Sequence, residues 1–462
     1  MVVLNAILQF FIQLLSNPSI LIALFVMVGL KVKKKAPTEI ITSVVKTILG
    51  FHLISSSATV IISSITPLGT MTSSAFGFTG IVPSNEACFG VAEGIYGSAL
   101  SGIIVLAMLV NLVIAKYTKF SFVYLTGHEM MWISTACAFI FTAFKMPLWQ
   151  VIVAGGLVTG LYMAVFPSFV YKDVSKITES KGISIAHTGS CLYWVAARVA
   201  ALTGDKNHST EEMNVPKSLA FLKDWNVALS LVMLVLYIIV SLIVMVTMPD
   251  VVIEAFGEGT NFIVGSINNA FDFTTGVFIL MAGVRLVVGE IVPAFQGISQ
   301  KFIPGAVASL DIPIVYPYYT TGTLVGFLLC IVAFIAGFLV NIAINHANPA
   351  FPVVLPNVVN AFYYGATYAC VANPNGGRRG AIIATLIVGF ITQFVPAFMI
   401  MWGGVVVEGT TFGGADTALL SIILNSLGKL LGGGLFTAVL AIFVVTFIVG
   451  VILKKNEKKE EA

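Results

Sequence analysis

Charged residues are scarce in this chain: they make up 10% of its 462 residues, whereas hydrophobic residues make up 58%. No polar segment is long enough for a soluble domain, and the longest one lies at about residues 203–226. The net charge of +3 leaves no basic domain that could bind nucleic acid. This composition indicates an integral membrane protein with many spans and excludes a soluble enzyme or a nucleic-acid-binding protein.

Cysteines and metal-binding motifs are also sparse. The five cysteines show neither C-x-x-C spacing nor a histidine at zinc-finger distance, so we interpret them as small apolar packing residues. The segment HEMMW, which starts at His128, resembles the zinc-protease motif H-E-x-x-H, but Trp132 stands at the position of the second histidine. We therefore expect no metal and no other cofactor.

Long apolar runs dominate what remains. A spanning helix needs about 20 apolar residues, and clear examples lie at about 94–116, 147–171, 227–248, 262–289, 319–344, 380–402 and 433–453. Apolar segments broken by polar residues lie at about 17–31, 40–66, 120–144, 183–202, 290–316, 350–372 and 414–428. Some of these are full spans and others half-helices or re-entrant hairpins. The pattern predicts an all-α polytopic membrane protein with about ten or eleven crossings.

Lysines near the span ends predict the orientation. KVKKK at 31–35 follows the first apolar segment, and KKNEKK at 454–459 follows the last. Lysine and arginine are enriched on the cytoplasmic side of a membrane. We therefore expect the N-terminus outside and the C-terminus in the cytoplasm.

The two halves of the chain suggest an internal repeat within a single membrane domain, 1–462. GFHLIS, which contains Phe51, lies over AFQGIS, which contains Phe295, at an offset of 244 residues, and Asn111 falls near Asn357 at an offset of 246. We predict one repeat at about 17–172 and the other at about 262–453, with a middle segment at about 183–226. Interrupted segments in corresponding halves point to a transporter's binding site.

The segment YLTGHEMMWIS carries His128 and Glu129 inside an otherwise apolar stretch. An ionisable residue at mid-bilayer costs roughly 2.5 to 3.5 kcal/mol, so these two residues call for an explanation. Imidazole donates and accepts hydrogen bonds and a carboxylate accepts them from hydroxyls, which suits a polyhydroxylated ligand. The alternative is that they pair with each other or with a neighbouring helix and hold the bundle together.

Two further polar clusters interrupt apolar segments. GISIAHTGSCLYW carries His187 and Thr188, which either line a site or form an interfacial histidine with a helix cap. GIVPSNEACFG carries Asn85 and Glu86. We interpret these two either as the tip of a re-entrant hairpin or as an exposed loop, with equal weight.

A further polar interruption, flanked by long apolar runs, is EIVPAFQGISQKFIPGAVASLD, residues 290–311. Gln296 and Ser299 share one helical face, and Asp311 follows a second short helix that we expect to begin at Pro304. Broken backbone at membrane depth is tolerated only where protein or a water-filled cavity surrounds it. We therefore expect the backbone to break near Gly297 and these three side chains to face an internal cavity.

KTILGF, YLTGHEMM, GISIAH and above all AFQGISQKFIPGAVASLD resemble the membrane component IIC of phosphotransferase-system permeases of the ascorbate type, related more distantly to the galactitol type. The resemblance runs from about residue 17 to 453. It implies eleven spans, inverted repeats that form a core and a dimerising domain, a homodimer in the bacterial cytoplasmic membrane, and an elevator-type motion. It also implies a substrate site at His128, His187 and Asp311, with phosphorylation by separate cytoplasmic IIA and IIB proteins.

The chain departs from that family pattern at the site. Trp132 and Thr188 stand where glutamines are expected, and Asn85 and Glu86 replace hydroxyl-bearing residues. We include all four among the candidate substrate-binding residues, and the substrate stays open between ascorbate and another sugar or polyol.

Two rival functions use the same ionisable side chains. A proton- or sodium-coupled secondary transporter would use Glu129 and Asp311 as coupling carboxylates. An intramembrane hydrolase would use a His-Glu-Asp site, but the sequence shows no serine or cysteine nucleophile motif to go with it.

Overall fold

The protein is described from a computed structural model that covers residues 18–76, 80–179, 182–213, 225–405, 407 and 409–460. Within this part of the chain, six helical stretches are long and apolar enough to cross a membrane: Asn85–Tyr117, Leu148–Thr178, Leu229–Thr247, Thr320–Ala347, Val358–Gly403 and Ala415–Glu457. The predicted all-α polytopic membrane protein is thereby confirmed. The number of crossings stays a prediction.

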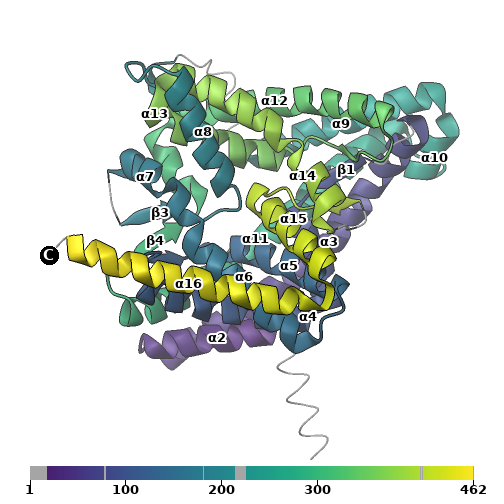
Figure 1. The fold of residues 1–462 in the computed structure, drawn as a ribbon. Helices are drawn as coiled ribbons and strands as arrows, with labels where there is room; N and C mark the ends of the chain where they lie inside the picture. The colour runs from purple at the N-terminus through teal and green to yellow at the C-terminus, as the bar shows by residue number, and fades with distance from the viewer. Residues whose placement is uncertain are drawn as a thin grey trace, which may run out of the picture.

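The first half of the chain alternates long helices with very short strands (Figure 1). Its elements are α2 (Pro18–Val32), α3 (Pro37–Phe76), β1 (Gly80–Pro83), α4 (Asn85–Tyr117), β2 (Phe122–Tyr124), α5 (Gly127–Ala143), α6 (Leu148–Val165), α7 (Pro167–Thr178), β3 (Ile183–Ile185), α8 (Ser190–Thr203) and η1 (Thr210–Glu212).

The second half follows a similar plan. Its elements are α9 (Trp225–Thr247), α10 (Pro249–Phe256), α11 (Phe262–Phe302), β4 (Val307–Leu310), η3 (Ile312–Tyr318), α12 (Thr320–Ala347), β5 (Val353–Val354), α13 (Val358–Thr392), α14 (Val395–Phe398), η4 (Met399–Gly403), β6 (Thr410–Thr411), α15 (Ala415–Leu431), η5 (Gly432–Gly434) and α16 (Leu435–Glu460).

The strands exchange partners between the halves. Strand β1 lies between β5 and β6, and β4 lies between β2 and β3, with every pair parallel. Each half therefore supplies the middle strand of a sheet whose outer strands come from the other half. These small sheets pair backbone groups that would otherwise be unsatisfied inside a membrane protein.

Asparagines hold the outer strands in place. The amide of Asn111 in α4 donates to the Phe122 carbonyl, and its oxygen accepts from the Tyr124 N–H, both in β2. In the second half, the oxygen of Asn341 in α12 accepts from the N–H of Val354 in β5. The residue that matches Asn111 in this role is thus Asn341.

The alignment of Asn111 with Asn357 is therefore wrong at this point. Asn357 instead begins α13, where its side chain accepts from the Asn360 N–H. Apolar helices align with one another at many offsets, so hydrophobicity alone could not select the correct one. The repeat boundaries themselves stay a prediction.

The expected break at Gly297 does not occur, because α11 continues through this residue to Phe302. Gly297 instead permits close packing, since a β-carbon there would overlap the side chain of Lys33, which follows α2 directly. The chain turns at Gly305, whose φ is 85°. Val307 then lies in strand β4, not in a second short helix.

Helix α13 contains a sharp turn. Gly376 and Gly377 have non-helical backbone angles, with φ of 57° at Gly377. On one side of this turn Gly365 packs closely on Gly326 of α12, and on the other side Gly389 packs on Ala333 of the same helix. Both arms of α13 therefore lie against α12.

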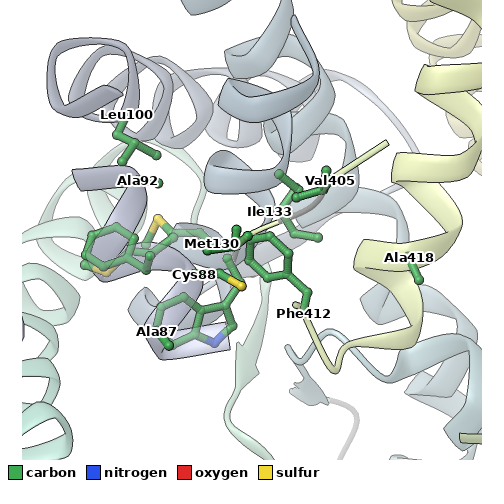
Figure 2. Packing of buried hydrophobic residues seen from close by; sticks show 14 of the residues in the cluster. Ala87, Cys88, Ala92, Leu100, Met130, Ile133, Val405, Phe412 and Ala418 are labelled. Carbon is green, nitrogen blue, oxygen red and sulfur yellow. The ribbon is translucent and has the colours of Figure 1, made fainter. Parts of the chain in front are cut away.

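An apolar core joins the helices that begin at the sheets. Figure 2 shows Ala87 and Cys88 of α4 beside Met130 of α5 and Phe412, all of them almost fully buried. Among the described cysteines, Cys88, Cys137, Cys330 and Cys370 are buried and Cys191 is half-buried. The interpretation of the cysteines as packing residues is confirmed for these four.

Candidate functional site: a polar pocket between the two halves

The described residues enclose one markedly polar pocket, with a volume of about 50 Å³. Its lining comes from both halves of the chain and consists of Asn85, Glu86, His128, Glu129, Trp132, His187, Asp311, Val359, Asn360, Tyr363 and Tyr364. A cavity of this size holds a few water molecules at most. A ligand as large as a sugar therefore requires lining side chains to move.

The lining residues reach the pocket because each follows a short strand. Asn85 follows β1, Glu129 follows β2, His187 follows β3, Asp311 follows β4 and Asn360 follows β5. A helix begins within three residues of each of these positions, and its first N–H groups have no partner within the helix. The sheets thus bring several helix starts, each with polar side chains, to one place.

Glu129 lies at the centre of this arrangement, and its side chain is 3% exposed. Its Oε2 accepts a hydrogen bond of 2.7 Å from the Thr188 N–H. Its Oε1 lies 3.2 Å from Nε2 of His187 and 3.5 Å from Nε2 of His128. Glu129 therefore links the segments that follow β2 and β3.

His128 extends the cluster to the second half of the chain. Its Nε2 lies 3.4 Å from Oδ2 of Asp311. The other oxygen of Asp311 accepts from the Ile312 N–H at 2.8 Å and so caps η3. The side chains of His128 and Asp311 are 18% and 36% exposed, so the cluster opens at this end.

His187 is held on all sides. Its Nδ1 lies 2.7 Å from the hydroxyl of Tyr193, and its backbone carbonyl accepts from the hydroxyl of Tyr162 at 3.0 Å. The ring of Tyr364 meets the imidazole nearly edge to face at 5.4 Å between centroids. The backbone N–H of the next residue, Thr188, donates a hydrogen bond to Glu129. These contacts fix the orientation of the imidazole.

Asn85 and Glu86 lie at the pocket, which decides between the two interpretations of their segment. Asn85 is 8% exposed, and its side-chain oxygen accepts from the Gly413 N–H at 2.9 Å. Glu86 accepts from the hydroxyl of Ser84, the residue that caps α4, at 3.0 Å. An exposed loop does not describe these residues.

Trp132 forms part of the pocket wall, and its ring lies 5.8 Å from that of Phe89. A matching aromatic, Tyr363, comes from the second half. Glu129 and Asn360 are each the third residue of their helices, α5 and α13, and Trp132 and Tyr363 are each the sixth. The two helices thus present a carboxylate or amide and an aromatic ring at equivalent positions.

Val359, Asn360, Tyr363 and Tyr364 are pocket residues that the sequence did not reveal. Their segment is apolar and aromatic and carries no ionisable residue to draw attention. Their position is the signal that could have identified them. They follow strand β5, just as the predicted site residues His128 and Glu129 follow strand β2.

Asp416 is a further residue that was missed. Its buried carboxylate accepts hydrogen bonds from the Ser190 and Cys191 N–H groups at 2.8 and 2.9 Å and from the Tyr162 hydroxyl at 3.2 Å. Its own N–H donates to the Thr188 carbonyl at 2.8 Å. Asp416 therefore attaches α15 to the start of α8, directly behind His187. A lone aspartate in the apolar segment GGADTALL was the signal that could have found it.

Gln296 and Ser299 lie in α11, but their side chains are outside the described part of the structure. Their role in a site stays a prediction. Of the other predicted site residues, all except Thr188 line the pocket through side chains, and Thr188 donates its N–H to one that does.

The chemistry available in the pocket is hydrogen bonding combined with aromatic contact. Carboxylates, amides and imidazoles bind hydroxyl groups, and the rings of Trp132, Tyr363 and Tyr364 offer apolar faces. Among the described lining residues there is no serine, threonine or cysteine to act as the nucleophile of a hydrolase. The arrangement suits binding of a small polyhydroxylated molecule.

Comparison with known proteins agrees with this chemistry. Residues 13–416 match the family described as PTS system sugar-specific permease component. The chain is 24% identical over 433 residues to a protein of Mycoplasma pneumoniae (strain ATCC 29342 / M129 / Subtype 1) named "Ascorbate-specific PTS system EIIC component". This alignment covers 83% of the chain and 65% of that relative, so the chain spans less than two thirds of the relative's length.

Proposed function

Because this chain belongs to the family of sugar-specific permease components of the phosphotransferase system (PTS), we propose that it carries a small sugar or polyol, ascorbate or a related compound, across the bacterial cytoplasmic membrane. A separate cytoplasmic IIB protein, itself served by a IIA protein, phosphorylates the substrate. The observation that supports this most is the polar pocket enclosed between the two halves of a membrane protein. The proposal includes a homodimer and an elevator-type motion, both of which rest on the family resemblance.

The small size of the pocket supports a moving carrier over a fixed channel. Its volume of about 50 Å³ has room for a few waters at most, and Glu129 is almost completely covered. Substrate entry and exit therefore both need a change in the protein around the pocket. Such alternation between closed and open forms is how a site inside a transporter serves two sides of a membrane.

The distribution of charge supports the proposed orientation. Lys454 of α16 donates to the Lys116 carbonyl at the end of α4, and Lys119 pairs with Glu457 at 2.6 Å. The C-terminus lies at this basic end of the molecule, and α10 lies at the other (Figure 1). Exposed acidic residues follow one another there: Asp250, Glu254 and Glu258. Because lysine and arginine are in excess on the cytoplasmic side of membrane proteins, the basic end faces the cytoplasm in this proposal.

Group translocation has a distinctive product, which gives the test. In cells or vesicles that contain this protein, substrate is expected to appear inside as a phosphate ester only when the soluble phosphorylating proteins and phosphoenolpyruvate are supplied. Ascorbate, galactitol and other sugars would be compared by mass spectrometry of the internal contents.

A second candidate is a proton-coupled secondary transporter. The observation that favours it is the continuous set of titratable groups, in which one nitrogen of His128 lies within 3.5 Å of both Glu129 and Asp311. Internal accumulation of unmodified substrate that collapses with a protonophore would support this candidate and reject group translocation.

Removal of a polar side chain from the pocket is expected to weaken binding without unfolding the protein. The loss of a ligand hydrogen bond that involves a charged partner costs about 1.5 to 3 kcal/mol, or roughly ten- to over a hundredfold in affinity, and this is the effect we expect in His128→Ala and Asp311→Asn. Asparagine still caps a helix, so η3 should persist in Asp311→Asn. Titration calorimetry on the purified variants measures the affinity.

Folding is checked independently of ligand by the melting temperature and the gel-filtration volume in detergent. Asp272→Asn, which changes an exposed residue of α11, serves as the matched control for charge removal. Unchanged affinity in both pocket variants would assign His128 and Asp311 a structural role.

A further inference from the structure

We propose that this pocket selects uncharged polyhydroxylated substrates over anionic ones such as ascorbate, and that Glu129 is the residue that sets the preference. The inference rests on the proposed transport function and narrows its substrate class. It comes from the lining residues, among which the described part of the chain places no lysine or arginine, and from the contacts that already engage both histidines and three backbone N–H groups near the pocket.

The described lining residues are rich in carboxyl groups. Glu86, Glu129 and Asp311 face the pocket together with two histidines, and no lysine or arginine is among the lining residues. Charges interact strongly where water is excluded, because the effective dielectric constant is far below that of water. An anionic ligand would therefore meet acidic side chains at close range, and none of the described lining residues supplies a fixed cation to bind it.

The two histidines are committed to partners within the protein. His187 uses Nδ1 for the Tyr193 hydroxyl, and its Nε2 lies 3.2 Å from Glu129. His128 directs Nε2 to both Glu129 and Asp311, at 3.5 and 3.4 Å. The imidazoles therefore already contact carboxyl groups of the protein, and an anionic ligand would have to compete for them.

The backbone donors that could have formed an anion site are also taken. The Thr188 N–H donates to Glu129, and the Gly413 N–H donates to Asn85. At the start of α8, where a helix N-terminus would attract an anion, the Ser190 N–H donates to Asp416. Acceptor side chains of the protein occupy these N–H groups.

What remains for a ligand is a set of carboxyl oxygens, the side-chain amides of Asn85 and Asn360, and aromatic residues. A carboxylate has four lone-pair sites, and Glu129 uses one for Thr188 while Asp311 uses one for Ile312. Hydroxyl groups donate to such acceptors, and a polyol or neutral sugar carries many of them. The pocket thus complements an uncharged polyhydroxylated molecule.

The direct test compares three probes on the purified full-length protein at pH 7 by titration calorimetry. L-Ascorbate is a monoanion at this pH, L-gulono-1,4-lactone has a similar five-membered ring without the acidic enediol, and galactitol is an open-chain neutral polyol. At least one neutral probe is expected to bind about tenfold or more tightly than ascorbate, a difference that corresponds to one decade in Kd.

Charge variants then identify the responsible residue. Glu129→Gln removes the charge but keeps an oxygen for the Thr188 N–H, so the ratio of ascorbate affinity to neutral-probe affinity should rise about tenfold. Glu86→Gln, at the edge of the pocket, is the second variant in case Glu129→Gln does not fold. Asn85→Asp, which adds an acidic group to the pocket, should lower the ratio of ascorbate affinity to neutral-probe affinity. Glu254→Gln, which removes the same charge from the exposed surface of α10, should leave it unchanged.

Three outcomes would overturn the inference: ascorbate binding at least as tightly as both neutral probes, no binding of any probe, or an unchanged ratio in the folded glutamine variants. The proposed function fails separately. If ascorbate enters cells as a phosphate ester, transport by the PTS holds and the inference is wrong. If neutral probes bind tightly but no ester forms, the substrate preference holds and group translocation is wrong.

Discussion

Asp416→Ala is expected to destabilise the protein by about 2 kcal/mol or more, because a buried donor that loses its partner costs about 1 to 3 kcal/mol and two further donors lose one of their two acceptors. The carboxylate accepts hydrogen bonds from Ser190, Cys191 and Tyr162 inside the protein. Its removal leaves the Cys191 N–H without its acceptor, while the Ser190 N–H and the Tyr162 hydroxyl keep only the His187 carbonyl, at 3.3 and 3.0 Å. Since this helix start follows His187 directly, loss of transport should accompany the loss of stability. Thermal unfolding of the purified protein and uptake in cells measure the two effects.

Asp416→Asn provides the comparison that isolates the carboxylate. Its one remaining oxygen retains part of the hydrogen bonding, so the fall in melting temperature should be smaller than in the alanine variant. Asp272→Ala changes an exposed aspartate and should have little effect. Equal melting temperatures for Asp416→Ala and the unmodified protein would show that this carboxylate does not hold α8.

Gly377→Ala is the second substitution with a large expected effect. Gly377 has φ of 57° and ψ of −162°, a combination that only glycine adopts readily. A β-carbon there would also overlap the carbonyl oxygens of Asp205 and His208, so the turn of α13 could not stay in place. Backbone atoms cannot move aside as a flexible side chain does. The substitution should therefore cost more than the 1 to 2 kcal/mol, roughly, of a left-handed backbone alone.

Gly257→Ala separates backbone strain from collision. Gly257 has φ of 90°, but a β-carbon there would meet no atom within 4 Å. Its effect on the melting temperature should reflect strain alone and be clearly smaller than that of Gly377→Ala. Similar melting temperatures for the two variants would mean that the loop around Asp205 and His208 yields to the added methyl group.

The fold class could be predicted from the sequence because burial in hydrocarbon leaves a plain signature in composition. The expected segment at 94–116 lies within α4, and that at 319–344 nearly coincides with α12. Polar residues in apolar surroundings are equally visible in a sequence, and this signal predicts His128 and Asp311 as site residues. Their proximity to each other is visible only in the structure. Their role in substrate binding stays a prediction.

The remaining features depend on contacts that hydrophobicity does not encode. Strands of two to four residues are too short to show a period of two, and their partners lie hundreds of positions away in the chain. Gly297 illustrates the same limit, because glycine serves a broken backbone and a close helix contact equally well. The sequence did not point to Asn360, because the free-energy cost of an amide side chain among aromatic residues is too small to mark it as unusual.

The exchange of strands between the halves has a consequence for biosynthesis. A ribosome delivers β1 to the membrane long before Val353–Val354 and Thr410–Thr411 have been made, so both edges of β1 wait without partners. An unpaired edge in hydrocarbon is unfavourable, and the nascent segment needs shelter in the insertion machinery or in water until the later strands arrive. The pocket therefore stays incomplete until the residues that follow β5 have been made. Chains that end before β6 would present incomplete sheets to the proteases that clear unassembled membrane proteins.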